Sequence, residues 1–322
     1  MFGMPNLSGK RGDHEVEGYR MRPWLWVLIG VLVLIILVIG GTALYVQGKA
    51  SALTNARFDV EVEPFDVPMD SATIARGEHI VRIRGCMECH GTDLAGRVFM
   101  DAGPVGMFAG SNLTGGKGGI GKGYRVEDWV RAVRHAVGPG GRPLIFMPSE
   151  DYRFVDDEDM AAMIAYIRSV PPVDNQPPPP EPGPIAKALY AFGDWPQLMA
   201  AEVVDHEAEV PPAPEPGPTK DYGAYLSTTC IGCHGTNLSG GKMPGQPPGV
   251  PNPTNLTPHP DATISSYEFS DFQTLMREGK RPDGSEINPF MPTGQFKHMT
   301  DTELQALWAY ISSREPVETG SR

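Results

Sequence analysis

Two five-residue motifs carry side chains whose types and spacing suit a metal cofactor. Both have the pattern C-x-x-C-H, and their functional residues are Cys86, Cys89, His90, Cys230, Cys233 and His234. Thiols three residues apart lie on one side of a helical turn, with the imidazole one position further on. This spacing suits two thioether bonds to the vinyl groups of a haem and a histidine on its iron, and it is typical of c-type haem attachment. The sequence therefore predicts two covalently bound haem c groups.

Two other interpretations of the cysteines compete with haem attachment. The pairs could hold one zinc ion, but about 140 residues separate them, against roughly 15–20 residues in compact zinc sites. A redox-active dithiol of the thioredoxin type requires a strand–helix–strand context, which the sequence around the motifs does not show. We therefore prefer haem attachment.

The ligand on the far side of each iron decides between electron transfer and catalysis, because a filled position leaves no room for peroxide or oxygen. Met147 and Met291 each lie 57 residues after the motif histidine, and each precedes a proline. His135 is the best histidine rival, but its counterpart in the second half is Glu278. Other methionines compete without this shared spacing, namely Met100, Met107, Met163, Met243 and Met299. We expect His/Met ligation, which raises the reduction potential, and therefore His90, Met147, His234 and Met291 as the metal ligands.

The two motifs belong to an internal repeat with an offset of 144 residues. Its middle slips by one, because Asn112-Leu113-Thr114 matches Asn255-Leu256-Thr257 at an offset of 143. Two diverged copies of one domain leave this pattern. We expect domains at residues 71–171 and 219–322, joined by a proline-rich linker at 172–218 that contains a short helical connector near 185–210.

Each copy predicts short helices separated by glycine-rich loops. One helix precedes each motif, at about 74–85 and 222–229, and another closes each copy, capped by Asp156 in the first and by the Thr300/Glu303 capping box in the second. Strand signals are weak, so the predicted fold class is all-α. We also expect the backbone carbonyls of Pro104 and Pro248 to accept the imidazole N–H groups. The tyrosines Tyr166 and Tyr310 are expected to pack on the first helix of each copy or to reach a haem propionate.

Residues 24–46 form an uncharged apolar run of 23 residues. As a helix it would be roughly 34 Å long, enough to cross a ~30 Å hydrocarbon core. A signal peptide usually has a shorter apolar region, and a buried core helix is rarely apolar on every face. We expect an uncleaved transmembrane helix, with a cytoplasmic tail at 1–23 and a stalk at 47–70. The basic residues before the run favour this orientation; they are Lys10, Arg11, Arg20 and Arg22.

Composition excludes some other classes of protein. Hydrophobic residues make up 40% of the chain, which excludes wholesale disorder. The net charge of −12 argues against nucleic-acid binding, because such a chain repels phosphate backbones. The 38 glycines and 33 prolines predict a loop-rich fold. The histidines without a repeat partner are expected to be surface or structural residues; they are His14, His79, His206, His259 and His298.

With its two C-x-x-C-H-G motifs, each followed by Met-Pro, the chain resembles class I c-type cytochromes twice over. The run from Gly141 to Val173 is similar to dihaem cytochromes that accept electrons from bacterial dehydrogenases. The plan of one anchor and two haem domains is also similar to the dihaem subunit of cbb3-type oxidases. The resemblance covers residues 71–322 and implies haem-wrapping helices and respiratory electron transfer. Some dehydrogenase cytochromes of this kind carry three haems, and this chain departs from them with two.

The expected function is that of a membrane-tethered dihaem cytochrome, which is an electron carrier and not itself an enzyme. Its haem domains would lie on the periplasmic side of a bacterial inner membrane. Its partners would be the lipid bilayer and a membrane or periplasmic redox complex, namely a dehydrogenase, a quinol-oxidising complex or an oxidase. The alternative is a dihaem peroxidase, which needs one haem whose distal ligand can leave.

Overall fold

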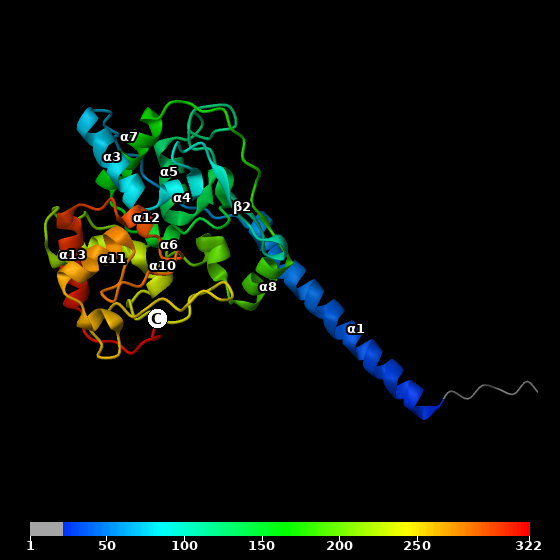
Figure 1. The fold of residues 1–322 in the computed structure, drawn as a ribbon. Helices are drawn as coiled ribbons and strands as arrows, with labels where there is room; N and C mark the ends of the chain where they lie inside the picture. The colour runs from blue at the N-terminus through cyan, green and yellow to red at the C-terminus, as the bar shows by residue number, and fades with distance from the viewer. Residues whose placement is uncertain (1–21) are drawn as a thin grey trace, which may run out of the picture. The chain divides into compact units, whose positions relative to one another are not determined.

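The computed structural model describes residues 22–322, so most of the expected cytoplasmic tail, with His14, Lys10, Arg11 and Arg20, lies outside the described residues. The chain divides into one unit that ends at Tyr45 and a second unit from Val46 to Arg322. The first unit is the greater part of helix α1 (Pro23–Ala50), and the second contains both repeats (Figure 1).

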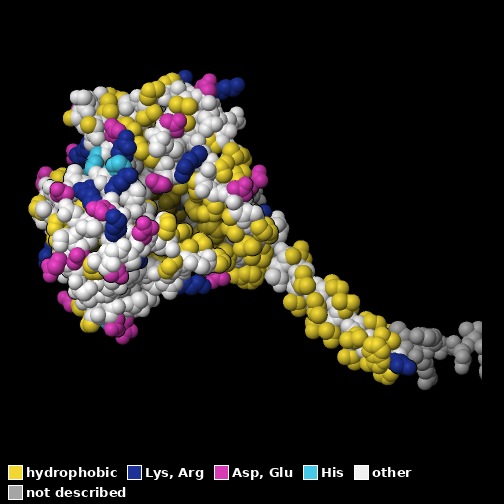
Figure 2. Space-filling model, viewed as in Figure 1, with side chains coloured by type: hydrophobic (Ala, Val, Ile, Leu, Met, Phe, Trp, Pro, Cys, Tyr) yellow, Lys and Arg dark blue, Asp and Glu magenta, His cyan; other side chains and the backbone are white. Residues whose placement is uncertain are grey.

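Helix α1 is the one described helix that is long and apolar enough to cross a membrane. Many of its residues are Val and Ile, which ordinarily disfavour helices. In a hydrocarbon environment a helix satisfies every backbone hydrogen bond within itself, so this composition suits a bilayer segment. Its exposed side chains are hydrophobic along its length (Figure 2). The predicted apolar helix is confirmed.

The first repeat is built from short helices with two small pairs of strands. Its elements are α2 (Ala52–Asn55) in the stalk, then α3 (Ser71–Ile83), α4 (Cys86–His90), β1 (Arg97–Asp101), η1 (Gly103–Val105), β2 (Gly106–Gly110), α5 (Val126–His135), β3 (Val137–Gly138), η2 (Pro139–Gly141), β4 (Arg142–Pro143), α6 (Ser149–Tyr152) and α7 (Asp157–Ser169). The predicted cap is confirmed, because the carboxylate of Asp156 accepts a hydrogen bond from the Asp159 N–H at 2.8 Å.

The linker and the second repeat continue the helical pattern. The linker carries β5 (Glu181–Pro182), α8 (Pro184–Phe192) and η3 (Pro196–Glu202). The second repeat has α9 (Lys220–Ser227), η4 (Thr228–Cys230), α10 (Ile231–His234), η5 (Thr263–Ser266), α11 (Phe269–Glu278), α12 (Thr293–Phe296) and α13 (Asp301–Ser312). Both halves of the predicted Thr300/Glu303 capping box are present.

The strands correct the expectation of an all-α fold. β1 pairs with β2 and β2 pairs with β5, all antiparallel, while β3 and β4 form a separate two-stranded ribbon. These strands are two to five residues long, too short to show an alternating pattern in the sequence. A bulge between Val98 and Met100 breaks the alternation further in β1.

In each repeat the first and last helices cross at a glycine. A Cβ atom added at Gly77 in α3 would lie 1.8 Å from the Ala162 carbonyl oxygen in α7, and one added at Gly223 in α9 would lie 2.0 Å from the Ala306 carbonyl oxygen in α13. Tyr166 and Tyr310 lie against the same crossings, so their expected packing on the first helix is confirmed. Figure 1 shows α3 beside α7.

The two repeats pack against each other about an approximate two-fold axis. Arg84 is bonded to Thr228, its own counterpart at the offset of 144, as expected for a pair near such an axis. Asp151 in α6 accepts the Gly232 N–H of the second motif at 2.8 Å. Its counterpart Gln295 in α12 lies against Gly85, directly before the first motif. The turn after each Met-Pro pair thus rests on the motif of the other repeat.

Candidate haem-binding sites

Each motif histidine is oriented by a backbone carbonyl. The Nδ1 atom of His90 lies 2.7 Å from the Ser111 carbonyl oxygen, and that of His234 lies 2.7 Å from the Thr254 carbonyl oxygen. Because a carbonyl only accepts, Nδ1 carries the proton and Nε2 keeps a lone pair for a metal. Burial lowers the pKa of both imidazoles, which favours the neutral form that binds metals.

The expectation that Pro104 and Pro248 supply these carbonyls is wrong. Ser111 and Thr254 supply them, and each directly precedes the repeated Asn-Leu-Thr. The one-residue slip of the repeat was therefore the signal that could have found them. Pro104 lies instead in η1, within the β1–β2 connection, where only the first repeat has strands.

Buried asparagines hold the loops that present these carbonyls. The Asn112 side-chain amide donates to the Val173 carbonyl at 2.8 Å, and that of Asn255 donates to the Val317 carbonyl at 2.7 Å. Each asparagine oxygen in turn accepts the N–H of the following threonine, Thr114 or Thr257. Both sets lie beyond the reach of local sequence patterns, because the partners are about 60 residues apart.

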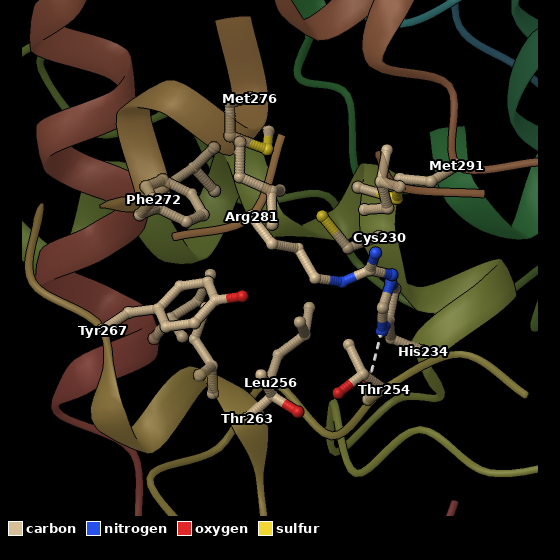
Figure 3. Close-up of a pocket in the computed structure, with 15 residues that line it drawn as sticks. Cys230, His234, Thr254, Leu256, Thr263, Tyr267, Phe272, Met276, Arg281 and Met291 are labelled. Atoms are coloured by element: carbon tan, nitrogen blue, oxygen red, sulfur yellow. Dashed lines mark hydrogen bonds between the residues drawn. The ribbon is translucent and has the colours of Figure 1, made fainter. Parts of the chain in front are cut away.

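The second site is an apolar cavity of about 770 Å³ into which Cys230, His234 and Met291 all face. Cys233 lines an adjoining cavity that shares His234 and Met291. Figure 3 shows Cys230, His234 and Met291 at one end of the first cavity, and Phe272 and Tyr267 at the other. The structure thus brings all four predicted residues of the second repeat together.

Arg281 was missed by sequence reasoning. It extends between the two ends of the second cavity toward His234 (Figure 3), and its guanidinium donates to the Glu286 carbonyl at 2.7 Å. No repeat partner marks it, since residue 137 at the offset of 144 is a valine. With Tyr267 it adds polar groups to a wall that is otherwise hydrophobic.

In the first site, Cys86 and Met147 pack against the same hydrophobic core, which α3, α5 and α7 build around Trp129 and Met160. Cys89 and His90 lie on the same short helix α4 as Cys86. Glycines with positive φ, Gly85 and Gly91, flank this helix and let the chain turn sharply at both ends.

The thiols do not behave as a zinc site or a reactive dithiol. None of the four is disulfide-bonded. Burial raises the pKa of all of them to about 11 or 12, whereas reactive or metal-binding thiols have a lowered pKa. Within residues 22–322 no group of three or more His, Cys, Asp and Glu side chains could hold a metal ion. Paired thiols, a free imidazole nitrogen, a thioether and an apolar cavity do fit a covalently attached haem.

The other histidines mostly have structural partners. His135 bonds to His206, with 3.0 Å between their Nδ1 atoms, which occupies this rival ligand. His79 pairs with Glu303 at 2.8 Å across the contact between the repeats. His259 lies 3.9 Å from Asp261, and His298 is exposed.

Comparison with known proteins agrees with these sites. The sequence profile of the family described as cytochrome c matches this chain twice, over residues 74–171 and 221–315. The chain belongs to the cytochrome c family and contains two cytochrome c domains. Such domains bind haem c covalently, so two matches indicate two haem groups.

Several relatives are cytochrome subunits of dehydrogenases. The cytochrome c subunit of the alcohol dehydrogenase (quinone) of Gluconacetobacter polyoxogenes is 39% identical over 95 residues, which is 28% of this chain and 20% of that protein. The fructose dehydrogenase cytochrome subunit of Gluconobacter japonicus is 33% identical over 112 residues, 32% of this chain and 23% of that protein. The gluconate 2-dehydrogenase cytochrome c subunit of Pantoea cypripedii is 33% identical over 95 residues, 28% of this chain and 22% of that protein. The chain thus matches less than a quarter of the length of each.

Proposed function

We propose that this protein is a membrane-anchored dihaem electron-transfer subunit of a respiratory dehydrogenase. The observation that carries the proposal is the second site, where two thiols, an imidazole with a free Nε2 and a thioether meet at one apolar cavity. The relatives support the dehydrogenase assignment, and they give the peroxidase alternative no support.

Each chemical group has a definite task in this proposal. When bound, a haem c supplies reversible one-electron transfer. The cysteines hold it to the chain, and His90 and His234 bind one side of each iron with Nε2. Met147 and Met291 fill the opposite side, which closes the position that a peroxidase must leave open. In the second site Arg281 and Tyr267 offer a cation and a hydroxyl to the carboxylates of the cofactor.

The packing of the repeats supports passage of electrons between the two sites. The turn after Met147-Pro148 rests on the second motif, through Asp151 and Gly232. Segments adjoining the ligands of both sites are therefore in direct contact, and the buried interface fixes their spacing. Helix α1 would hold this two-site unit at the membrane, where tethering raises its effective concentration near a membrane partner.

The haem count can be tested directly. The full-length protein should retain two porphyrin masses after denaturation, and the double substitution Cys230→Ala and Cys233→Ala should retain one. A denatured wild-type chain without attached porphyrin would refute the proposal.

The axial ligands need a separate test. Met147→His and Met291→His should each lower the potential of one haem and remove half of the methionine-to-iron charge-transfer band. As a matched control, Met69→His changes an exposed methionine in the stalk and should leave the spectrum unaltered. An unchanged spectrum in Met147→His and Met291→His would contradict the ligand assignment.

A further inference from the structure

The residue before Met147 has an unusual backbone conformation. Phe146 has φ of +65°, in the left-handed region that non-glycine residues rarely adopt. This conformation costs roughly 1 kcal/mol or more and persists only where surrounding contacts impose it. The Phe146 N–H donates a 3.0 Å hydrogen bond to the carbonyl of Leu198, which belongs to η3 of the linker. The linker therefore contributes directly to the conformation of the methionine loop.

Aromatic packing strengthens this contact. The Trp195 ring meets the Phe146 ring edge-on, with 5.3 Å between centroids and an angle of 89°. Phe108 of β2 packs on both rings, at 5.0 Å and 6.0 Å. Trp195 is only 9% exposed and Leu198 is fully buried, and Met147 packs against the same cluster. Water is thus largely excluded from this side of the methionine loop.

The linker segment is itself fastened to the first repeat. The Nδ1 atoms of His206 and His135 lie 3.0 Å apart, and His206 Nε2 lies 3.0 Å from the Ala201 carbonyl oxygen. The Arg153 guanidinium, in the same repeat, donates to the Asp205 carbonyl at 2.7 Å. These bonds hold the linker on both sides of α6, so the segment that contacts Phe146 is not a loose loop.

The second repeat offers an internal comparison, because Phe290-Met291-Pro292 repeats Phe146-Met147-Pro148. Beyond the methionine the two loops agree: the second residue after each methionine donates its N–H to the methionine carbonyl at 2.8 Å. Before the methionine they differ. The Phe290 N–H donates to the Asn288 side chain at 2.9 Å, the ring is 45% exposed, and φ is not positive.

We propose that the linker is a positioning device for Met147, with Trp195 and Leu198 holding Phe146 so that the thioether is fixed toward the first site. The loop of Met291 is set locally by Asn288 and lacks this support. The two haems, although carried by copies of one domain, would therefore differ in how firmly sulfur holds the iron, with the first held more firmly. This inference rests on the proposed function, because it requires Met147 to be an iron ligand.

The test uses the full-length holoprotein carrying Met291→His, so that any remaining methionine-to-iron band belongs to the first site. Adding Trp195→Leu keeps apolar volume but removes the ring contact with Phe146. We expect added imidazole to displace the first-site methionine about tenfold faster, a change of about 1.4 kcal/mol in the barrier. The potential of the first haem should shift while that of the second stays constant. Trp195→Phe, which retains an aromatic ring, should restore most of the wild-type rate.

Phe290→Ala, placed in Met147→His protein, is the matched control in the second repeat and should change imidazole entry there less than twofold. An unchanged rate and potential in Trp195→Leu, with a wild-type circular dichroism spectrum, would overturn the inference. If Trp195→Leu fails to fold, the milder Trp195→Phe decides, and it should then show a partial acceleration. A protein that keeps its full band in Met147→His would instead refute the ligand assignment itself, so the two failures are distinguishable.

Discussion

Replacing Gly77 with alanine tests the helix crossing that frames the first site. The added Cβ would lie 1.8 Å from the Ala162 carbonyl oxygen, 2.5 Å from its carbonyl carbon and 2.9 Å from the Tyr166 Cβ. The nearest obstacle is backbone, so no flexible side chain can move aside. Helices α3 and α7 would have to separate by about an ångström to restore ordinary contact distances.

The expected loss of stability follows from two opposing effects. Alanine gains roughly 1 kcal/mol over glycine through helix propensity. Overpacking a well-packed core costs typically 1–3 kcal/mol and more where backbone must shift, and here Ile80, Val81 and Ile164 lose contacts as the helices separate. We expect a net decrease of about 2 kcal/mol in the free energy of unfolding.

Urea denaturation of the holoprotein, followed by far-ultraviolet circular dichroism, measures this change. Gly223→Ala is the equivalent variant in the second repeat and should lose a similar amount, because its added Cβ lies 2.0 Å from the Ala306 carbonyl oxygen. Gly294→Ala is the control: nothing lies within 4 Å of the added atom, so this variant should gain up to about 1 kcal/mol. If Gly77→Ala were as stable as the wild type, the close crossing would be wrong.

Three further predictions concern the contacts that join the parts of the protein. Arg84, 2% exposed, donates to Thr228 at 2.7 Å and to Thr229 at 2.8 Å and lies 5.0 Å from the Tyr225 ring centroid, so Arg84→Met should cost about 2–3 kcal/mol in urea titrations. A double-mutant cycle with Thr228→Val should show coupling, and additive effects would contradict this contact. Hydrogen bonding to Glu303 raises the pKa of His79, so this pair should stabilise the protein fully below about pH 6.5 and lose its effect as pH rises through the raised pKa. His79→Gln should remove that alkaline loss, and a pH profile identical to the wild type would rule the pair out. Burial, aided by Arg153 and His206, lowers the pKa of His135 to about 3, so stability should fall as pH drops from about 6.5 toward 3, by at most about 1.4 kcal/mol per pH unit. His135→Gln should flatten this acid slope, and an unchanged slope would assign it to other groups.

Local chemistry was the part of this protein that its sequence predicted well. The C-x-x-C-H motifs define their own short helices, and Asp156 and Thr300 cap the helices that follow the methionines. Such features depend on residues within one helical turn of each other. The repeat extended this information, because spacing shared by two copies singled out Met291, which the structure places at the second cavity with His234.

Contacts between distant segments could not be predicted in this way. The carbonyls of Ser111 and Thr254 accept hydrogen bonds through backbone atoms, which leave no mark on residue type. Arg84 and His79 have no repeat partner because they meet the other copy, and an offset search finds only resemblance. Strand β2 pairs with β5 about 75 residues later, where only two residues form the ladder.

The reciprocal contact between each post-methionine turn and the opposite motif means that neither half of this protein is a self-sufficient module. A fragment ending in the linker would leave the Asp151 carboxylate without the Gly232 N–H and the Arg84 guanidinium without its threonines. Swapping in a domain from a relative would create the same mismatch unless both faces were exchanged together. After duplication, each copy became part of the other's scaffold, so changes on one face must be matched by changes on the other.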